Sequence, residues 1–317
     1  MLSRVADSLY WIGRYSERLE TNTVLLERQM EHILEHSSND KTIELEWTAI
    51  VKICGYYDEY VALYPDVNIR DVLYYLLYDQ RNLNSIVSMC ESIRFNLKNT
   101  RDVLPNELWE TWHDVRLLIH SFIDEEINIM EVGPFLKQLR TYCLTMTGII
   151  DSLMVRDESY MFLKIGKWLE RGEKTSLICK TLLQIKDEKG YMFAADYALH
   201  LTNIHDDFSR KNRVRSDMGV LQFIMTDLHS TKAVNYAIHK IHRTILDLQQ
   251  GQFESYTDEI FKMLFDMRNL LKVDCTIYDF EDRVEWVNKI HDQCIKFGPV
   301  FSRTYYLTPP ILVSQQA

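Results

Sequence analysis

The 317-residue chain is 46% hydrophobic and carries a formal net charge of −10, with only ten glycines and six prolines. This composition favours long helices around a sizeable core. The acidic balance argues against a nucleic-acid partner, because a protein that binds the phosphate backbone needs a basic face. No signal-peptide core opens the chain and no run approaches the ~20 apolar residues of a membrane span, so a cytoplasmic protein without a membrane partner is expected.

Apolar positions at helical spacing, together with capping residues, predict six helices in the first half of the chain. Ser3 begins the first helix, and Asn84 or Ser85 caps the fourth. Gly133-Pro134 is predicted to separate the fifth helix from the sixth. The six spans are about Ser3–Glu35, Thr42–Tyr60, Ile69–Tyr78, Ser85–Val103, Pro105–Glu126 and Phe135–Val155.

The second half shows the same pattern, without a strand or hairpin signal. A long helix capped by Asp157 is predicted to end near Gly190, and a basic linker is predicted at residues 210–215. Pro309-Pro310 marks a tail. The other helical segments are about Met192–Ile204, Val220–Asp227, Thr231–Gln250, Thr257–Val273 and Phe280–Lys296.

An internal repeat underlies this organisation. Residues Leu9–Glu20 and Leu163–Glu173 share the order Ile-Gly, cation, aromatic, any residue, Glu-Arg, any residue, Glu, at a shift of 166 − 13 = 153. A second match, of Val72–Asp79 with Val220–Asp227, has a shift of 227 − 79 = 148. A repeat at half the chain length predicts an all-α, duplicated multi-helix bundle. We expect units 1–155 and 156–300, related by a pseudo-twofold and sharing one core, with a tail at 301–317, all within one continuous domain.

The repeated motif also places carboxylates on apolar helix stripes. An unpaired charge there is costly, so each carboxylate needs a cation, backbone donors or a metal. Two interpretations stay open: buried salt bridges that fix helix packing, or a pocket in which arginines hold an anionic group and carboxylates hold an amine or a metal. A glycine one turn earlier in each copy would allow close helix approach. The acid–base candidates are Glu17, Glu20, Glu170 and Glu173.

Other polar residues are candidates for binding an anion or substrate. A polar turn runs from Asp79 to Ser85 at a helix N-terminus, where anion binding or plain capping are both consistent with the sequence. The full set is Arg4, Arg14, Arg18, Asp79, Asn82, Asn84, Ser85, Arg156, Lys167 and Arg171. A di-iron bundle needs two Glu-x-x-His motifs, whereas the chain has one, Glu110 to His113. No P-loop or dinucleotide motif is present, so no metal and no cofactor are predicted.

The opening residues Met1-Leu2-Ser3-Arg4-Val5-Ala6 and Leu9–Arg18 resemble the start of the bacterial alpha-E domain family. Further matching segments are Asp79–Ile86, Glu107–Glu110, Met154–Glu158 and Phe162–Arg171. The chain departs from the family at Leu83-Asn84, where Asn-Pro is common, and at Lys167, where arginine is usual. The resemblance implies an all-helical protein whose gene lies beside, or is fused to, one for a circularly permuted ATP-grasp protein, often with a transglutaminase-like protease.

This context implies a role in forming or processing an amide or peptide bond. We therefore expect an accessory protein that binds an ATP-grasp amide ligase, with the ligase's peptide or amino-acid substrate as a further candidate ligand, and that is not catalytic on its own. Two alternatives remain: an enzyme whose buried Glu/Arg groups act as acid and base on amide substrates, and a purely structural helical scaffold. The oligomeric state is not predicted.

Overall fold

The computed structural model describes residues 1–35, 40–122, 128–187, 190–191, 195–211, 216–251 and 255–306. Within these ranges the protein contains fourteen α-helices, which confirms the all-α prediction. The only strands described are β1 (Lys186–Asp187) and β2 (Gly190–Tyr191), a two-residue antiparallel pair. The expectation that no strand interrupts the helices was therefore wrong at this one hairpin, which follows directly on a long helix.

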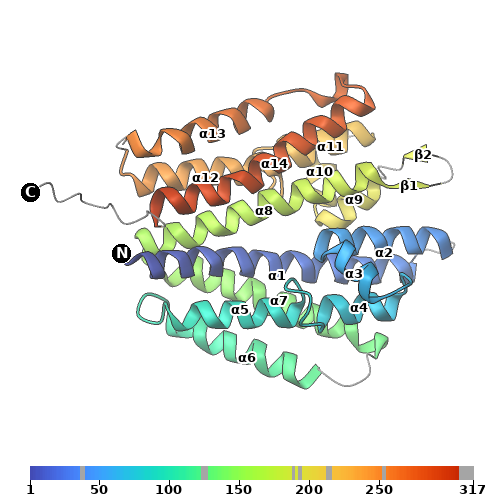
Figure 1. Ribbon diagram of the computed structural model, residues 1–317, viewed down its shortest axis with the longest axis horizontal. Coiled ribbons are helices and arrows are strands. Elements are labelled where there is room, and N and C mark those ends of the chain that lie inside the picture. The colour runs from blue at the N-terminus through green and yellow to red at the C-terminus, as the bar shows by residue number, and fades with distance from the viewer. Residues whose placement is uncertain are drawn as a thin grey trace, which may run out of the picture.

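Two long helices form the centre of the molecule. α1 (Ser3–Glu35) and α8 (Glu158–Gln184) lie side by side and run in the same direction (Figure 1). Leu9, Leu19 and Leu25 of α1 are fully buried, as are Ile165 and Leu169 of α8. Because α1 and α8 are each apolar on more than one face, each packs against its partner and against other helices at once.

The remaining helices pack on either side of this central pair. One group comes from the first half of the chain and the other from the second half (Figure 1). The first group comprises α2 (Asp40–Cys54), α3 (Tyr57–Leu63), α4 (Ile69–Leu77), α5 (Ile86–Lys98), α6 (Asn106–Phe122) and α7 (Ile129–Leu153). The second comprises α9 (Ala195–Thr202), α10 (His205–Lys211), α11 (Asp217–Thr226), α12 (Val234–Leu248), α13 (Asp258–Leu270) and α14 (Phe280–Tyr305), with 3₁₀ turns at Ser255–Thr257 and Cys275–Ile277. In the first group α5 and α7 pack against α1, and in the second α12 and α14 pack against α8. α2 and α9 each contact both central helices.

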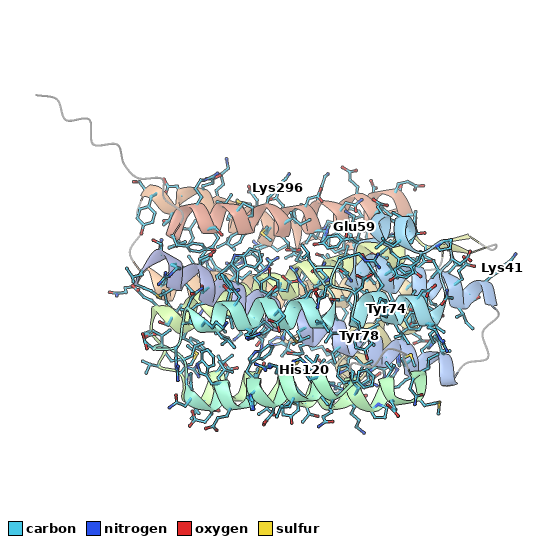
Figure 2. All side chains as sticks on the ribbon, turned by 60° about the horizontal axis from the view of Figure 1, so that its bottom comes forward. Lys41, Glu59, Tyr74, Tyr78, His120 and Lys296 are labelled. Atoms are coloured by element: carbon cyan, nitrogen blue, oxygen red, sulfur yellow. The ribbon has the colours of Figure 1, made fainter. Side chains whose placement is uncertain are left out.

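The buried apolar side chains of both groups form one continuous cluster. Side chains fill the spaces between the helices, whereas charged residues such as Lys41 and Lys296 project from the surface (Figure 2). No helix in the described ranges is both long and apolar enough to cross a membrane. The unit boundary at residue 155 and the duplication of the whole chain stay predictions.

Several predicted helix boundaries were wrong for identifiable reasons. The helix expected over Thr42–Tyr60 is broken at Gly55, where an added Cβ would lie 2.7 Å from the Tyr75 ring. α7 begins after the Asn128 cap and carries Pro134 within its second turn, so Gly133-Pro134 does not separate two helices.

Two helix ends and one linker in the second half also differ from prediction. α8 ends at Gln184 instead of near Gly190. Part of the expected basic linker is helical in α10, and residues 212–215 lie outside the described ranges. α14 continues past Lys296 to Tyr305, with Pro299 inside it, so the tail does not start at residue 301. The rest of the predicted tail, residues 307–317, lies outside the described ranges.

Candidate functional site

The two copies of the repeated motif meet at their glycines. A Cβ added at Gly13 would lie 2.0 Å from the carbonyl oxygen of Leu163, and one at Gly166 would lie 2.1 Å from the carbonyl oxygen of Tyr10. The contact is reciprocal, since each glycine faces the residue three positions before the other. Glycine at both positions lets the two backbones touch. The next turn of each helix, with its Glu-Arg pair, is thereby brought within reach of the other helix.

Two ion pairs cross between the helices at this turn. Arg18 donates to both carboxylate oxygens of Glu170, from Nε at 2.6 Å and from Nη2 at 3.0 Å. Arg171 donates in the same way to Glu17, from Nε at 2.6 Å and from Nη2 at 2.7 Å. The third guanidinium nitrogen is also used in each case: Arg18 Nη1 donates to Asn84 Oδ1, and Arg171 Nη1 donates to the carbonyl of Thr231. Such two-point pairing fixes both distance and orientation.

Further charged groups complete the network, and here the halves differ. Arg14 Nη2 donates to Glu173 at 2.8 Å, and Arg14 Nε lies 2.6 Å from Glu170 as an ion contact without hydrogen-bond alignment. On the other side, Lys232 donates to Glu20 at 3.0 Å and lies 3.8 Å from Glu17. We name these eight residues the Glu–Arg network: Arg14, Glu17, Arg18, Glu20, Glu170, Arg171, Glu173 and Lys232.

The Glu–Arg network pairs four carboxylates with four cations and is largely closed to solvent. The side chains of Glu17 and Glu170 are fully buried, whereas those of Glu173 and Lys232 are each 21% exposed. Burial by itself would raise the pKa of Glu170, but the charges of Arg14 and Arg18 outweigh it and lower that pKa. Burial is similarly opposed at Glu20, where Lys232, Arg171 and Lys167 bring the pKa to about 2. The raised pKa that an acid–base role at these two carboxylates would need is therefore not found.

Two lysines border the network without pairing closely to a carboxylate. Lys167 is buried and donates to Thr147 Oγ1 at 3.1 Å; burial lowers its pKa to about 8, against the opposing charges of Glu17 and Glu20. Lys174 donates to the carbonyl of Ile53 at 2.6 Å, and burial lowers its pKa as well. The two lysines lie beside a network whose four carboxylates are already matched by four cations.

Lowering the pH should destabilise the Glu–Arg network within a pH range set by the pKa of Glu20. The pKa of Glu20 is lower in the folded state than in the unfolded state. Its contribution to the free energy of unfolding is therefore complete above the unfolded pKa near 4.5 and is lost as the pH falls towards 2. Urea unfolding at a series of pH values should show the free energy of unfolding falling between about pH 4.5 and pH 2. Glu20 should account for about 3 kcal/mol of that decline, so Glu20→Gln should flatten it. A variant with the wild-type pH slope would contradict this assignment.

The polar turn between α4 and α5 contributes one residue that contacts the Glu–Arg network. Asn84 accepts from Arg18, as described above. The other three serve the turn itself: Asp79 accepts from the backbone and side chain of Arg81, Asn82 donates to the carbonyl of Tyr75, and Ser85 caps α5. The Arg81 hydrogen bonds lower the pKa of Asp79. These contacts support the capping interpretation for Asp79, Asn82 and Ser85.

Two predicted binding residues lie apart from the network. Arg4 is exposed on the first turn of α1. Arg156 is exposed, donates to the carbonyl of Asp151, and lies 4.0 Å from the ring centre of Tyr160. The structure thus brings together Arg14, Arg18, Arg171 and Asn84 with the four glutamates, places Lys167 beside them, and leaves Arg4 and Arg156 elsewhere.

Lys232 is the network residue that sequence reasoning missed. The shift of 148 that aligns Val72–Asp79 with Val220–Asp227 also aligns Asn84 with Lys232, since 232 − 84 = 148. Extending the repeat by five residues would have placed Lys232 at the position of Asn84, but not beside Glu20. In one half the turn offers an amide to Arg18; in the other it offers a cation to Glu20.

No metal cluster accompanies these groups. Among the described residues no three His, Cys, Asp or Glu side chains gather as metal ligands. A cavity of about 20 Å³ borders Arg171 and Lys232, which is room for about one water molecule. The network itself can therefore orient the two helices and hold one small polar molecule at its margin.

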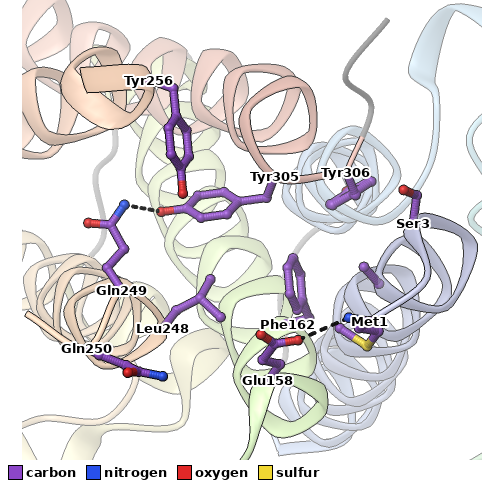
Figure 3. Close-up of a pocket in the computed structure, with 11 residues that line it drawn as sticks. Met1, Ser3, Glu158, Phe162, Leu248, Gln249, Gln250, Tyr256, Tyr305 and Tyr306 are labelled. Carbon is purple, nitrogen blue, oxygen red and sulfur yellow. Dashed lines mark hydrogen bonds and ion pairs between the residues drawn. The ribbon is translucent and has the colours of Figure 1, made fainter. Parts of the chain in front are cut away.

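A larger cavity of about 430 Å³ lies where α1 and α8 begin (Figure 3). Phe162 and Tyr305 are among the residues that line it, and the Tyr305 hydroxyl accepts from Gln249 Nε2 at 3.1 Å. At its edge the α-amino group of Met1 lies 3.4 Å from Glu158. None of the four predicted acid–base glutamates lines this cavity.

Comparison with known proteins gives one family match. The Alpha-E model, described as "a predicted alpha-helical domain with a conserved ER motif", matches residues 1–306. Glu-Arg occurs in this chain at positions 17–18 and 170–171, which form the two ion pairs, and also at 27–28.

Three curated relatives carry the name of uncharacterised proteins, one from Mycobacterium bovis and two from strains of Mycobacterium tuberculosis. Each is 24% identical over 267 residues, which cover 77% of this chain and 30% of the relative. The chain thus spans about a third of the length of the relatives it matches. No solved structure matches.

Proposed function

The chain belongs to the Alpha-E family, and on this premise we propose that it is a non-catalytic partner of a circularly permuted ATP-grasp amide ligase. It would bind the ligase and help present its peptide or amino-acid substrate. The gene neighbourhood implied by the family resemblance supports the choice of partner. The absence of a phosphate-binding motif from the sequence supports assigning ATP chemistry to the other protein.

One observation carries the non-catalytic part of the proposal. The four carboxylates that were candidates for acid–base work are each engaged by arginine or lysine at 2.6 to 3.0 Å. A general acid or base must reach its substrate and change protonation near the working pH. Glu20, with a pKa of about 2, stays ionised at neutral pH. The network is better suited to holding α1 and α8 in one relative position, on which a docking surface depends.

We expect the purified chain to form a stable complex with the circularly permuted ATP-grasp protein that the family resemblance implies is encoded beside it. The measurement is size-exclusion chromatography with light scattering, followed by titration calorimetry with and without ATP and candidate amino acids. An unrelated ATP-grasp ligase serves as the control protein. If neither co-elution nor binding heat is found for the neighbouring protein under any of these conditions, the proposed partnership is wrong.

The enzyme alternative is separable by Glu20→Gln. If the isolated chain turns over an amide substrate, and this variant loses turnover while keeping its melting temperature, Glu20 acts in catalysis. A fall in melting temperature with unchanged ligase-dependent activity would instead indicate that Glu20 acts through packing.

A further inference from the structure

A groove of about 530 Å³ lies between the α5–α6 turn and the junction of α7 with α8, apart from the two cavities described above. Both turns lie at the end of the bundle where the chain begins (Figure 1). Its floor is formed by Leu104 and Met154, each 7% exposed. Its walls carry Val103, Leu153 and Val155, which are 38%, 51% and 76% exposed. These adjacent apolar side chains give the groove an open apolar surface that an apolar side chain of another molecule can cover.

The polar residues that line this groove are all acidic. Asp102, Glu107 and Asp157 contribute the carboxylates. Asp157 also caps α8, since its Oδ1 accepts from the backbone of Ser159 and Tyr160. Asp102 and Glu107 are exposed at the rim. The groove therefore combines an apolar floor with negative charge around its edge.

Two arginines that are close to the groove in sequence make contacts elsewhere. Arg156 donates to the carbonyl of Asp151 and stacks on Tyr160. Arg101 lies 5.9 Å from the ring centre of Trp109. Neither arginine is among the residues that line the groove, whose charged side chains are all acidic.

We propose that this groove docks a segment of a partner protein in which an apolar side chain stands next to a lysine or arginine. The apolar side chain, with the aliphatic stem of the cation, covers Val103, Leu153 and Val155, and the charged end reaches the rim carboxylates. Charge complementarity of this kind sets orientation and association rate, and the apolar contact holds the complex. The groove does not include the Glu–Arg network, so its residues can be changed without altering the α1–α8 contact.

The choice of the neighbouring ATP-grasp protein as probe rests on the proposed function. Asp102→Asn with Glu107→Gln removes two rim charges with little change in shape and leaves the Asp157 cap intact. We expect binding to weaken about tenfold at low ionic strength, with a shallower salt dependence. Leu153→Ser with Val155→Ser should weaken binding at all salt concentrations. Glu44→Gln with Asp266→Asn, an equal charge change on exposed positions of α2 and α13, is the matched control.

A second probe makes the test independent of the ligase. Nitrogen-15 NMR titration with the peptide acetyl-Leu-Lys-Leu-Arg-amide should shift the amide signals of Val103, Glu107 and Val155 first, and the Asp102→Asn/Glu107→Gln variant should abolish those shifts. If the ligase binds the groove variants as it binds wild type, this inference is wrong while the proposed function stands. If the ligase does not bind at all, the proposed function fails, and peptide shifts away from the groove would overturn this inference too.

Discussion

Replacing Gly13 or Gly166 by alanine is expected to destabilise the protein by about 4 kcal/mol or more, which is at the extreme of single substitutions. The added methyl group would lie 2.0 Å from a backbone oxygen at Gly13 and 2.1 Å at Gly166. Flexible side-chain ends can move aside, but here the neighbouring atom belongs to a packed helix backbone. The helices would have to separate, and the ion pairs one turn later would stretch with them. Urea unfolding followed by circular dichroism measures the loss.

Two other glycines supply controls for this substitution. Gly172 lies on α8 itself, and its added Cβ would meet other atoms only at 3.7 Å or more, an ordinary contact distance. Gly148 lies on α7 with nothing within 4 Å. Because alanine favours helix over glycine by about 1 kcal/mol, Gly172→Ala and Gly148→Ala should be neutral or stabilising. If Gly13→Ala behaved like these two, the close approach of α1 and α8 would be incorrect.

Replacing Glu170 by glutamine is expected to cost about 3–5 kcal/mol of stability, because it leaves the buried charge of Arg18 without a counter-ion and leaves Arg14 paired with Glu173 alone. Glutamine keeps the size and one acceptor of the side chain, so the loss reports charge more than shape. Thermal and urea unfolding at neutral pH measure it. Glu173→Gln is the matched control on the same helix: its side chain is 21% exposed, and its loss should be clearly smaller.

A double replacement tests whether the network acts through packing. Glu17→Leu with Arg171→Met exchanges a buried ion pair for apolar side chains of similar length. Such exchanges are often neutral or better, whereas each single change leaves an unpaired buried charge. The double variant should therefore be more stable than either single variant. If it folds stably but no longer binds the ligase, the pair itself contributes to binding; if it keeps binding, the network is structural.

Much of the architecture was predictable because helix formation follows local rules. The predicted first helix, Ser3–Glu35, agrees with α1. Asp157 caps α8, as was predicted from its position just before a segment with helical apolar periodicity. The errors were at breaks and ends: the helix predicted over Thr42–Tyr60 is broken after Cys54, where the Tyr75 hydroxyl bonds to the backbone of Tyr56, and Pro134 lies inside α7 although Gly-Pro usually marks a boundary.

The sequence predicted which residues form the candidate site better than it predicted which of them pair with each other. The repeat identified Glu17, Glu170, Arg18 and Arg171 as one constellation, and the structure pairs each arginine with the glutamate of the other copy. The sequence did not reveal which cation neutralises Glu20. Lys232 lies more than 200 residues away along the chain, in a turn whose match to the first half is weak, and only packing of α12 on α8 brings it close.

The sequence by itself determined the all-helical class, the two matched motifs and the inward orientation of their glutamates, because helical periodicity and repeat spacing are encoded locally. Only the tertiary structure decided that those glutamates are paired and closed to solvent. That outcome depends on how near two backbones can approach, which the two glycines permit, and on which distant cations the surrounding helices carry into the gap. Burial raises the pKa of a carboxylate, whereas pairing with a cation lowers it. The balance of the two effects depends on the assembled fold.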